Sequence, residues 1–284
     1  MPLNENALYN WPFEPVVQRY EDSDVMLYAL SIGIGSDPVN AKELPYVYED
    51  GLRFFPTMLA VLGCPPPFSA DPASGINRTK MVHGEQGLEI LQPLPATGEI
   101  HAIDKIIDIT DKGKDRGATI TSRRTISDAS GKELARLDST VFCRADGGFG
   151  GKAQAATEPH AIPDRAPDFV VDMPTLPQQA LLYRLNFDRN PLHADPALAA
   201  RAGFERPILH GLCSWGIAAH AIVRQCCDYE ADRLRRFQAR FSRPVLPGDT
   251  LSVEIWQDGN EISFRGWVKA RQEKVLDNGY AQLT

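Results

Sequence analysis

A weak internal repeat is the feature that most restricts how this chain of 284 residues can fold. Three segments of the first half resemble three segments of the second half, in the same order and at a nearly constant displacement. Residues 27–33 match residues 182–188 at a displacement of 155. The segment that begins at residue 56 matches the segment that begins at residue 207, at a displacement of 151. Residues 93–99 match residues 245–249. Self-similarity at a fixed displacement is the signature of a duplicated unit, so the sequence predicts two copies of one domain.

The stretch between the two copies has the composition of a linker. Glycines crowd residues 146–152, and a run rich in alanine and proline follows as far as Pro167. Glycine and proline interrupt helices and strands. We therefore predict an N-terminal domain at residues 1–150, a linker at 151–167 and a C-terminal domain at 168–284.

Each half is predicted to contain a short helix, a longer apolar helix and several strands. In the second half the longer helix is expected over residues 207–228, because apolar residues recur there at helical spacing. Alternation of apolar and polar residues predicts the strands. These are residues 100–109, 118–126 and 133–142 in the first half, and 251–256 and 262–268 in the second. A helix wrapped by an antiparallel sheet, twice over, is an α+β fold.

Composition and motifs exclude several classes of function. The chain has 30 Lys and Arg against 37 Asp and Glu, a formal net charge of −7, which argues against a nucleic-acid-binding surface. The five cysteines lack metal-ligand spacing, and no glycine-rich segment has the spacing of a nucleotide loop. No apolar run approaches the roughly 18 residues of a membrane span. We therefore expect a cytoplasmic protein that needs no metal or redox cofactor and binds neither nucleic acid nor membrane.

Two segments of the second half carry candidate chemistry. Asp188, Asn190 and His193 lie within six residues around a proline, so a carboxylate, an amide and an imidazole can converge on one small site. The same residues also suit a plain turn with capped helices. His210 and Gly211 lie at a predicted helix N-terminus, where free backbone N–H groups receive a developing oxyanion. An acid/base cluster beside an oxyanion donor is what enolate chemistry next to a carbonyl requires.

The stretch from Tyr183 to Pro196 resembles the hydratase 2 motif of MaoC-like (R)-specific enoyl-CoA hydratases. The resemblance continues at residues 202–204, 207–213, 239–241 and 247–248, and in the first half at 81–86 and 111–113, which look like the two-domain, eukaryotic-type members. It implies a double hotdog fold whose second half keeps the catalytic motif. The first half has lost that motif and shapes a pocket for the acyl chain.

The resemblance also implies roles for individual residues. Asp188 and His193 look like the pair that holds and activates water, with Asn190 orienting it and the Gly211 N–H stabilising the thioester oxyanion. The residues that fall where the family contacts acyl-CoA are His83, Gly84, Lys112 and Phe241. Among these, Lys112 suits a CoA phosphate.

The implied activity is the reversible hydration of trans-2-enoyl-CoA to (3R)-3-hydroxyacyl-CoA, a hydro-lyase reaction of fatty acid metabolism, performed by a homodimer without a cofactor. An acyl-CoA thioesterase and a non-catalytic acyl-CoA-binding subunit are the alternatives. The second alternative follows from Phe187, which stands where the family usually has glycine. A left-handed backbone at Phe187 would be strained and would displace Asp188, whereas an ordinary backbone would leave Phe187 as packing or as a narrowing of the acyl tunnel.

Overall fold

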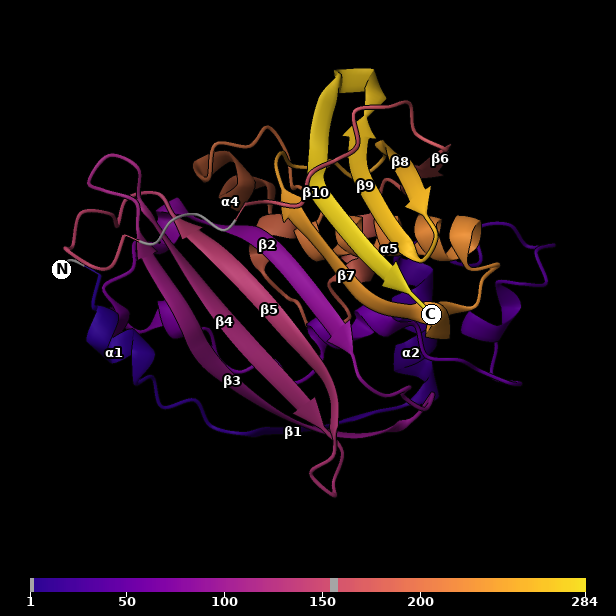
Figure 1. Cartoon of the computed structure of the whole chain (residues 1–284), viewed down its shortest axis with the longest axis horizontal. Coiled ribbons are helices and arrows are strands. Elements are labelled where there is room, and N and C mark those ends of the chain that lie inside the picture. The colour runs from indigo at the N-terminus through magenta and orange to yellow at the C-terminus, as the bar shows by residue number, and fades with distance from the viewer. Residues whose placement is uncertain (1–2, 154–157) are drawn as a thin grey trace.

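The computed structural model describes residues 3–153 and 158–284. Within these ranges ten strands form one antiparallel sheet, in the order β1-β3-β4-β5-β2-β7-β10-β9-β8-β6 (Figure 1). The strands are β1 (Val16–Tyr20), β2 (Met81–Ile90), β3 (Gly98–Asp111), β4 (Ala118–Ser127), β5 (Glu133–Cys143), β6 (Phe169–Pro174), β7 (Leu234–Phe241), β8 (Thr250–Asp258), β9 (Glu261–Val268) and β10 (Glu273–Leu283). The α-helices are α1 (Glu5–Tyr9), α2 (Asp22–Ser31), α3 (Gln179–Tyr183), α4 (Pro196–Arg201) and α5 (Gly211–Cys226).

Two halves with the same strand order make up this sheet. In each half the second strand of the sequence lies at the junction, so β2 pairs with β7, and the first strands, β1 and β6, lie at the outer edges. The repeat predicts this identical order. All five predicted strands are confirmed, since they fall within β3, β4, β5, β8 and β9. The described part of the predicted linker forms neither helix nor strand, and residues 154–157 lie outside the described residues.

The helix α5 occupies the centre of the second half, against β6, β7 and β8 (Figure 1). Every residue from Cys213 to Val223 is buried, so this helix is surrounded by the core on all sides. It begins at Gly211, four residues later than the sequence predicts. The Leu209 N–H donates to the carbonyl oxygen of Val245 at 2.8 Å, and this bond holds the preceding segment against a neighbouring chain segment instead of in a helix.

The long helix expected in the first half is absent from the described residues. Its place is taken by a 3-10 helix, Pro56–Val61, in which every residue is buried. The three consecutive prolines at 65–67 explain why this helix stays short, because proline lacks the N–H that continues a helix and clashes with the preceding turn. The fold class is unaffected, since a short helical segment still lies against the sheet in this half.

Equivalent residues of the two halves meet where α2 packs on α3. The rings of Tyr28 and Tyr183, which the repeat aligns, lie 6.1 Å apart between centroids. The aligned residues Ser31 and Asn186 are joined by a hydrogen bond of 2.9 Å from the Asn186 amide to the Ser31 hydroxyl. Contact between aligned positions places both pairs beside a local two-fold axis that relates the halves. None of the helices described here is both long enough and apolar enough to cross a membrane.

Candidate active site

The loop after α3 carries the motif residues in a series of tight turns. The Asp188 carboxylate accepts the Asn190 N–H at 3.3 Å, and the Asn190 side-chain oxygen accepts the Leu192 N–H at 3.1 Å. Asp195 accepts the Ala197 N–H at 2.8 Å and so caps α4. The prediction that these residues form turns and cap a helix is therefore confirmed. In each turn, however, only one oxygen of the Asp or Asn side chain accepts a hydrogen bond. The second carboxylate oxygen of Asp188 and the amide N–H₂ of Asn190 keep their capacity to bind other groups.

His193 is held in one orientation by a backbone carbonyl. It closes the 3-10 helix Pro191–His193, is buried, and its Nδ1 lies 2.8 Å from the carbonyl oxygen of Ile208. A carbonyl oxygen only accepts, so Nδ1 carries the hydrogen and the neutral ring presents a bare lone pair at Nε2. An imidazole fixed in this way is prepared to take a proton at Nε2.

His210 stacks directly on His193. The two ring centroids lie 3.7 Å apart and the planes differ by 27°. Burial and the adjacent His193 together lower the pKa of His210 to about 4. Burial also lowers the pKa of His193, and the hydrogen bond to Ile208 opposes that shift only in part. Both imidazoles are therefore neutral at physiological pH, with His193 free to act as a base.

The Asp188 carboxylate lies near both rings. Its charge opposes the effect of burial on the pKa of His193 and of His210. Its backbone oxygen also lies 3.3 Å from Nε2 of His210, which donates this hydrogen bond. The structure thus brings Asp188, His193 and His210 into one cluster.

Gly211, the first residue of α5, adjoins this cluster in sequence and in space. Among the residues described, nothing accepts a hydrogen bond from its N–H, which is expected of the first turn of a helix. A Cβ at this position would lie 3.3 Å from ring atoms of Phe241, so a larger residue would have to displace that ring. Glycine here allows Phe241 to cover the start of the helix while the N–H stays available to an anion.

His83 completes this side of the site. Its ring lies 4.7 Å from that of Phe241, and its Nε2 donates to the carbonyl oxygen of Glu85 at 3.1 Å. Burial lowers the pKa of His83 to about 4, and the Asp188 charge opposes this shift. Gly84 follows at a bulge in the pairing of β2 with β5, where a Cβ would lie 3.2 Å from the carbonyl oxygen of Thr140. His83 and Phe241, from β2 and β7, therefore meet at the N-terminus of α5.

Lys112 stands apart from the cluster. It is exposed on the turn after β3, and its Nζ lies 5.7 Å from the ring centroid of Phe142. A Cβ at Gly84 would lie 3.9 Å from Cβ of Phe142, so the Phe142 side chain has Lys112 on one side and Gly84 on the other. Asn190 is also exposed, at the edge of the motif loop. Its backbone carbonyl oxygen accepts the His193 N–H at 3.3 Å.

Phe187 adopts the left-handed conformation that the sequence leaves open, with φ of 66°. Its side chain is 48% exposed, so burial of the ring gives little compensation for the strain. Asp188 nevertheless stays close enough to His83, His193 and His210 for its charge to oppose the shift in each pKa.

Two further residues belong to the site although the sequence assigns their side chains no role. His210 is one of the two stacked imidazoles. Its position directly before Gly211 is the sequence feature that indicates a place in the site. Tyr183 packs on His210 with ring centroids 5.0 Å apart. Its hydroxyl is buried and has no hydrogen-bond partner among the described residues, and burial raises its pKa. No sequence pattern indicates that contact, because it depends on how Tyr183 of α3 packs on the residue before α5.

Comparison with known proteins identifies the family. Residues 158–278 match the MaoC like domain, and residues 18–145 match the MFE-2 hydratase 2 N-terminal domain. The enoyl-CoA hydratase ChsH3 of Mycobacterium tuberculosis is 41% identical over 283 residues, which cover 98% of each chain. This chain belongs to the family of MaoC-like dehydratases.

Solved structures of MaoC-like proteins share the fold. The MaoC-like dehydratase of Phytophthora capsici is 33% identical, with a TM-score of 0.87 over 99% of this chain and 98% of that one. A more distant M. tuberculosis protein described as a double hotdog fold is 12% identical, with a TM-score of 0.58 over 95% of this chain and 96% of that one. The MaoC-like protein described here therefore has the double hotdog fold that its sequence predicts.

Proposed function

We propose that this MaoC-like protein adds water reversibly to trans-2-enoyl-CoA and forms (3R)-3-hydroxyacyl-CoA. The observation that carries the proposal is the pair of neutral, stacked imidazoles beside Asp188 and the free Gly211 N–H. Its relative ChsH3 is named an enoyl-CoA hydratase. The substrate is a CoA thioester, and the chemistry is that of a hydro-lyase in fatty acid metabolism.

In the proposed mechanism Asp188 and His193 bind the attacking water. Oxygen adds to C3 of the enoyl group, C2 gains a proton, and negative charge develops on the thioester oxygen. The Gly211 N–H stabilises this charge from the positive end of α5. Nε2 of His193 and the second oxygen of Asp188 share the proton transfers, and the free amide of Asn190 orients the water.

The contacts to substrate follow from the same arrangement. We assign His83, Gly84 and Phe241 to the thioester and the adjacent part of the ligand, because His83 and Phe241 cover the N-terminus of α5 and Gly84 adjoins His83. Lys112, exposed and cationic, is assigned to a CoA phosphate. The N-terminal domain, which has Gly33 and Pro38 in place of Asp188 and His193 at the displacement of 155, is assigned to the acyl chain.

The decisive experiment follows the loss of enoyl-thioester absorbance with short and long trans-2-enoyl-CoA substrates. We expect hydration to the 3R product, and a loss of about 10²- to 10⁴-fold in Asp188→Asn and in His193→Ala. The matched control is Asp195→Asn in the same loop. Asparagine caps a helix as well as aspartate does, so this variant should keep full activity.

Other outcomes distinguish the alternatives. Release of free CoA from saturated acyl-CoA would replace the hydratase by a thioesterase. Tight binding of acyl-CoA without turnover, unaffected by Asp188→Asn, would indicate a binding subunit. Unchanged hydration in both Asp188→Asn and His193→Ala would place the active site elsewhere.

We also propose that the protein is a cytoplasmic homodimer. The sheet ends in two open edges, and the edge strands β1 and β6 carry the exposed side chains of Val17 and Val170. Unpaired, exposed edges favour association. Light scattering after size-exclusion chromatography should give twice the chain mass of 31.4 kDa, and a monomer mass at micromolar concentration would refute the dimer.

A further inference from the structure

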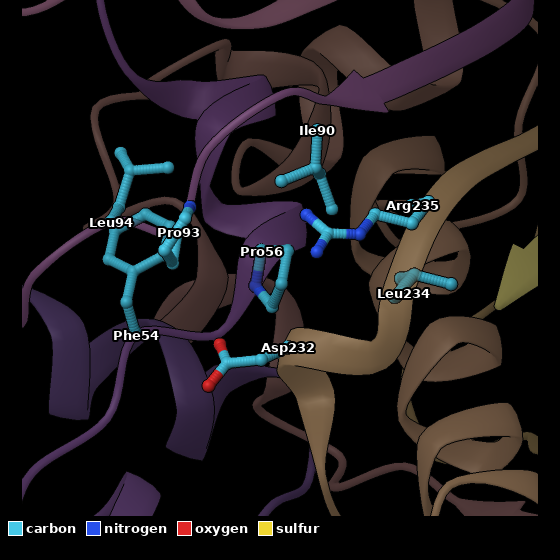
Figure 2. A pocket seen from close by; sticks show the side chains of 8 residues that line it. All are labelled: Phe54, Pro56, Ile90, Pro93, Leu94, Asp232, Leu234 and Arg235. Atoms are coloured by element: carbon cyan, nitrogen blue, oxygen red, sulfur yellow. The ribbon is translucent and has the colours of Figure 1, made fainter. Parts of the chain in front are cut away.

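A second pocket lies at the junction of the two halves, away from the candidate active site. It has a volume of about 150 Å³ and is enclosed between the 3-10 helix Pro56–Val61, the end of β2 and the start of β7 (Figure 2). The apolar residues that line it are Phe54, Pro56, Ile90, Pro93, Leu94 and Leu234. A cavity of this volume holds a group the size of a benzene ring.

The position of this pocket follows from the symmetry of the fold. Gly87 on β2 faces Gln238 on β7, and their separation of 151 residues equals the displacement of the repeat between Pro56 and Pro207. A two-fold rotation about an axis through that pair relates each residue of β2 to the residue of β7 that lies 151 positions later in the sequence.

This axis relates part of the pocket to part of the candidate active site. At the displacement of 151, His83 corresponds to Leu234, Gly84 to Arg235, and Ile90 to Phe241. Ile90, Leu234 and Arg235 all line the pocket, so the residues that the repeat aligns with Phe241, His83 and Gly84 lie together in the structure. The pocket therefore includes the positions equivalent to His83, Gly84 and Phe241 in the duplicated fold. Its lining contains no histidine among the residues described, so it lacks the base for hydration.

Two residues of opposite charge, Asp232 and Arg235, line the pocket. Asp232 is paired with Arg53, whose Nη2 lies 2.9 Å from its carboxylate. The Arg235 side chain has no hydrogen bond or ion pair with any residue in the described ranges, and Figure 2 shows its guanidinium extending from β7 between Ile90 and Pro56. An unpaired guanidinium beside apolar walls is suited to a carboxylate that carries a short apolar chain.

We infer that this pocket is a second ligand site, which binds a short-chain monocarboxylate with its carboxylate on Arg235 and its chain among Ile90, Leu94 and Leu234. A bidentate Arg–carboxylate pair fixes the head group, and the volume limits the chain to about six carbons. The site binds without turnover, and it is independent of the hydratase reaction.

The test is a titration of the whole protein with hexanoate, followed by backbone amide chemical shifts. Binding of a ligand this small is expected near millimolar affinity. The largest shifts should fall at Ile90, Leu234 and Arg235. Hexylamine, which has the same chain and the opposite charge, should leave these amides unchanged.

Two variants and one matched control make the test specific. Arg235→Gln should weaken hexanoate binding at least about tenfold, because a hydrogen bond to a charged group is lost. Ile90→Phe, which installs the residue found at the equivalent position of the active site, should fill the cavity and abolish binding. Arg236→Gln is the control, since the neighbouring Arg236 is paired with Glu89 at 2.6 Å instead of facing the pocket. It should bind hexanoate normally.

Several results would overturn the inference. These are the absence of shifts well above millimolar hexanoate, shifts centred on Gly211 and Phe241, equal binding of hexylamine, and unchanged binding by Arg235→Gln. Because the readout is binding, it is unaffected by the outcome of the hydration assay. The amide spectrum of each variant also reports whether it is folded.

Discussion

At the scale of single residues, the backbone of Phe187 is the feature that departs most from ordinary geometry. An L-residue in the left-handed region costs about 1–2 kcal/mol, and the half-exposed phenylalanine ring recovers little of that by packing. We predict that Phe187→Gly is about 1 kcal/mol more stable than Phe187→Ala, because both lose the ring but only glycine adopts φ of 66° without strain. Urea denaturation of both variants measures this difference. Equal stability, or a more stable alanine variant, would show that no strain is stored there.

The stacked histidines predict a dependence of stability on pH. Burial lowers the pKa of His210 to about 4, below the value of about 6.5 in an unfolded chain. Between these two values the unfolded chain binds more protons, so the free energy of unfolding decreases as pH falls from 6.5 to 4. His210→Gln removes this titration, and its stability should vary less with pH over that window. Chemical denaturation at half-unit steps of pH measures both slopes, and parallel curves would contradict the prediction.

At the scale of elements, the contact between α2 and α5 depends on a glycine. A Cβ at Gly216 would lie 2.8 Å from Cγ2 of Ile32 and 2.9 Å from the Tyr28 hydroxyl, so backbone or side chains must move. We predict that Gly216→Ala lowers stability by about 1–2 kcal/mol, because overpacking outweighs the higher helix propensity of alanine. Combining it with Ile32→Ala removes the contact with Cγ2 of Ile32 and leaves the contact with the Tyr28 hydroxyl. Thermal denaturation should therefore show that the double variant loses less than the sum of the single losses. Strict additivity would disprove the clash.

The elements also show where sequence reasoning succeeds. Strands β3, β4, β5, β8 and β9 were predictable because alternation of apolar residues reports directly on a sheet with one buried face. The short 3-10 helix at Pro56–Val61 was not predictable, because its apolar residues fit a long helix equally well. Only the prolines that follow it limit its length. The motif pointed to Asp188, His193 and Gly211, whereas the stacking of His210 and the backbone of Phe187 depend on tertiary packing.

At the scale of the whole molecule, buried polar contacts join the two halves. Glu43 of the first half is 2% exposed, and its carboxylate accepts the Gly35 N–H at 2.6 Å and lies 3.3 Å from Nε2 of His220 on α5. The sheet is also continuous across β2 and β7. Because both the sheet and this pair cross between the halves, the halves are expected to unfold together.

The Glu43–His220 pair tests that expectation. Burial opposes ionisation of Glu43, but the hydrogen bonds from His220 and Gly35 and the nearby positive charges outweigh it, so the pKa of Glu43 is lowered. A carboxyl group with a lowered pKa adds stability above its unfolded value of about 4.3, and this stability is lost as pH falls through the folded value. We predict that Glu43→Gln costs about 2 kcal/mol at pH 7, and that its difference from the native protein narrows below pH 4.

The control for this prediction is Glu49→Gln, at an exposed position nearby, which should change stability by less than about 0.5 kcal/mol. Denaturation of Glu43→Gln is followed by far-ultraviolet circular dichroism, which reports on the sheet of both halves. It is also followed by tryptophan fluorescence, which reports mainly on the second half, because three of the four tryptophans, Trp215, Trp256 and Trp267, lie there and only Trp11 lies in the first half. If the Glu43–His220 pair stabilises both halves as one unit, both signals of Glu43→Gln should have the same midpoint. This midpoint should lie at a lower denaturant concentration than in the native protein. Two separated midpoints in the native protein as well as in Glu43→Gln would mean that each half unfolds by itself and that the pair does not couple them.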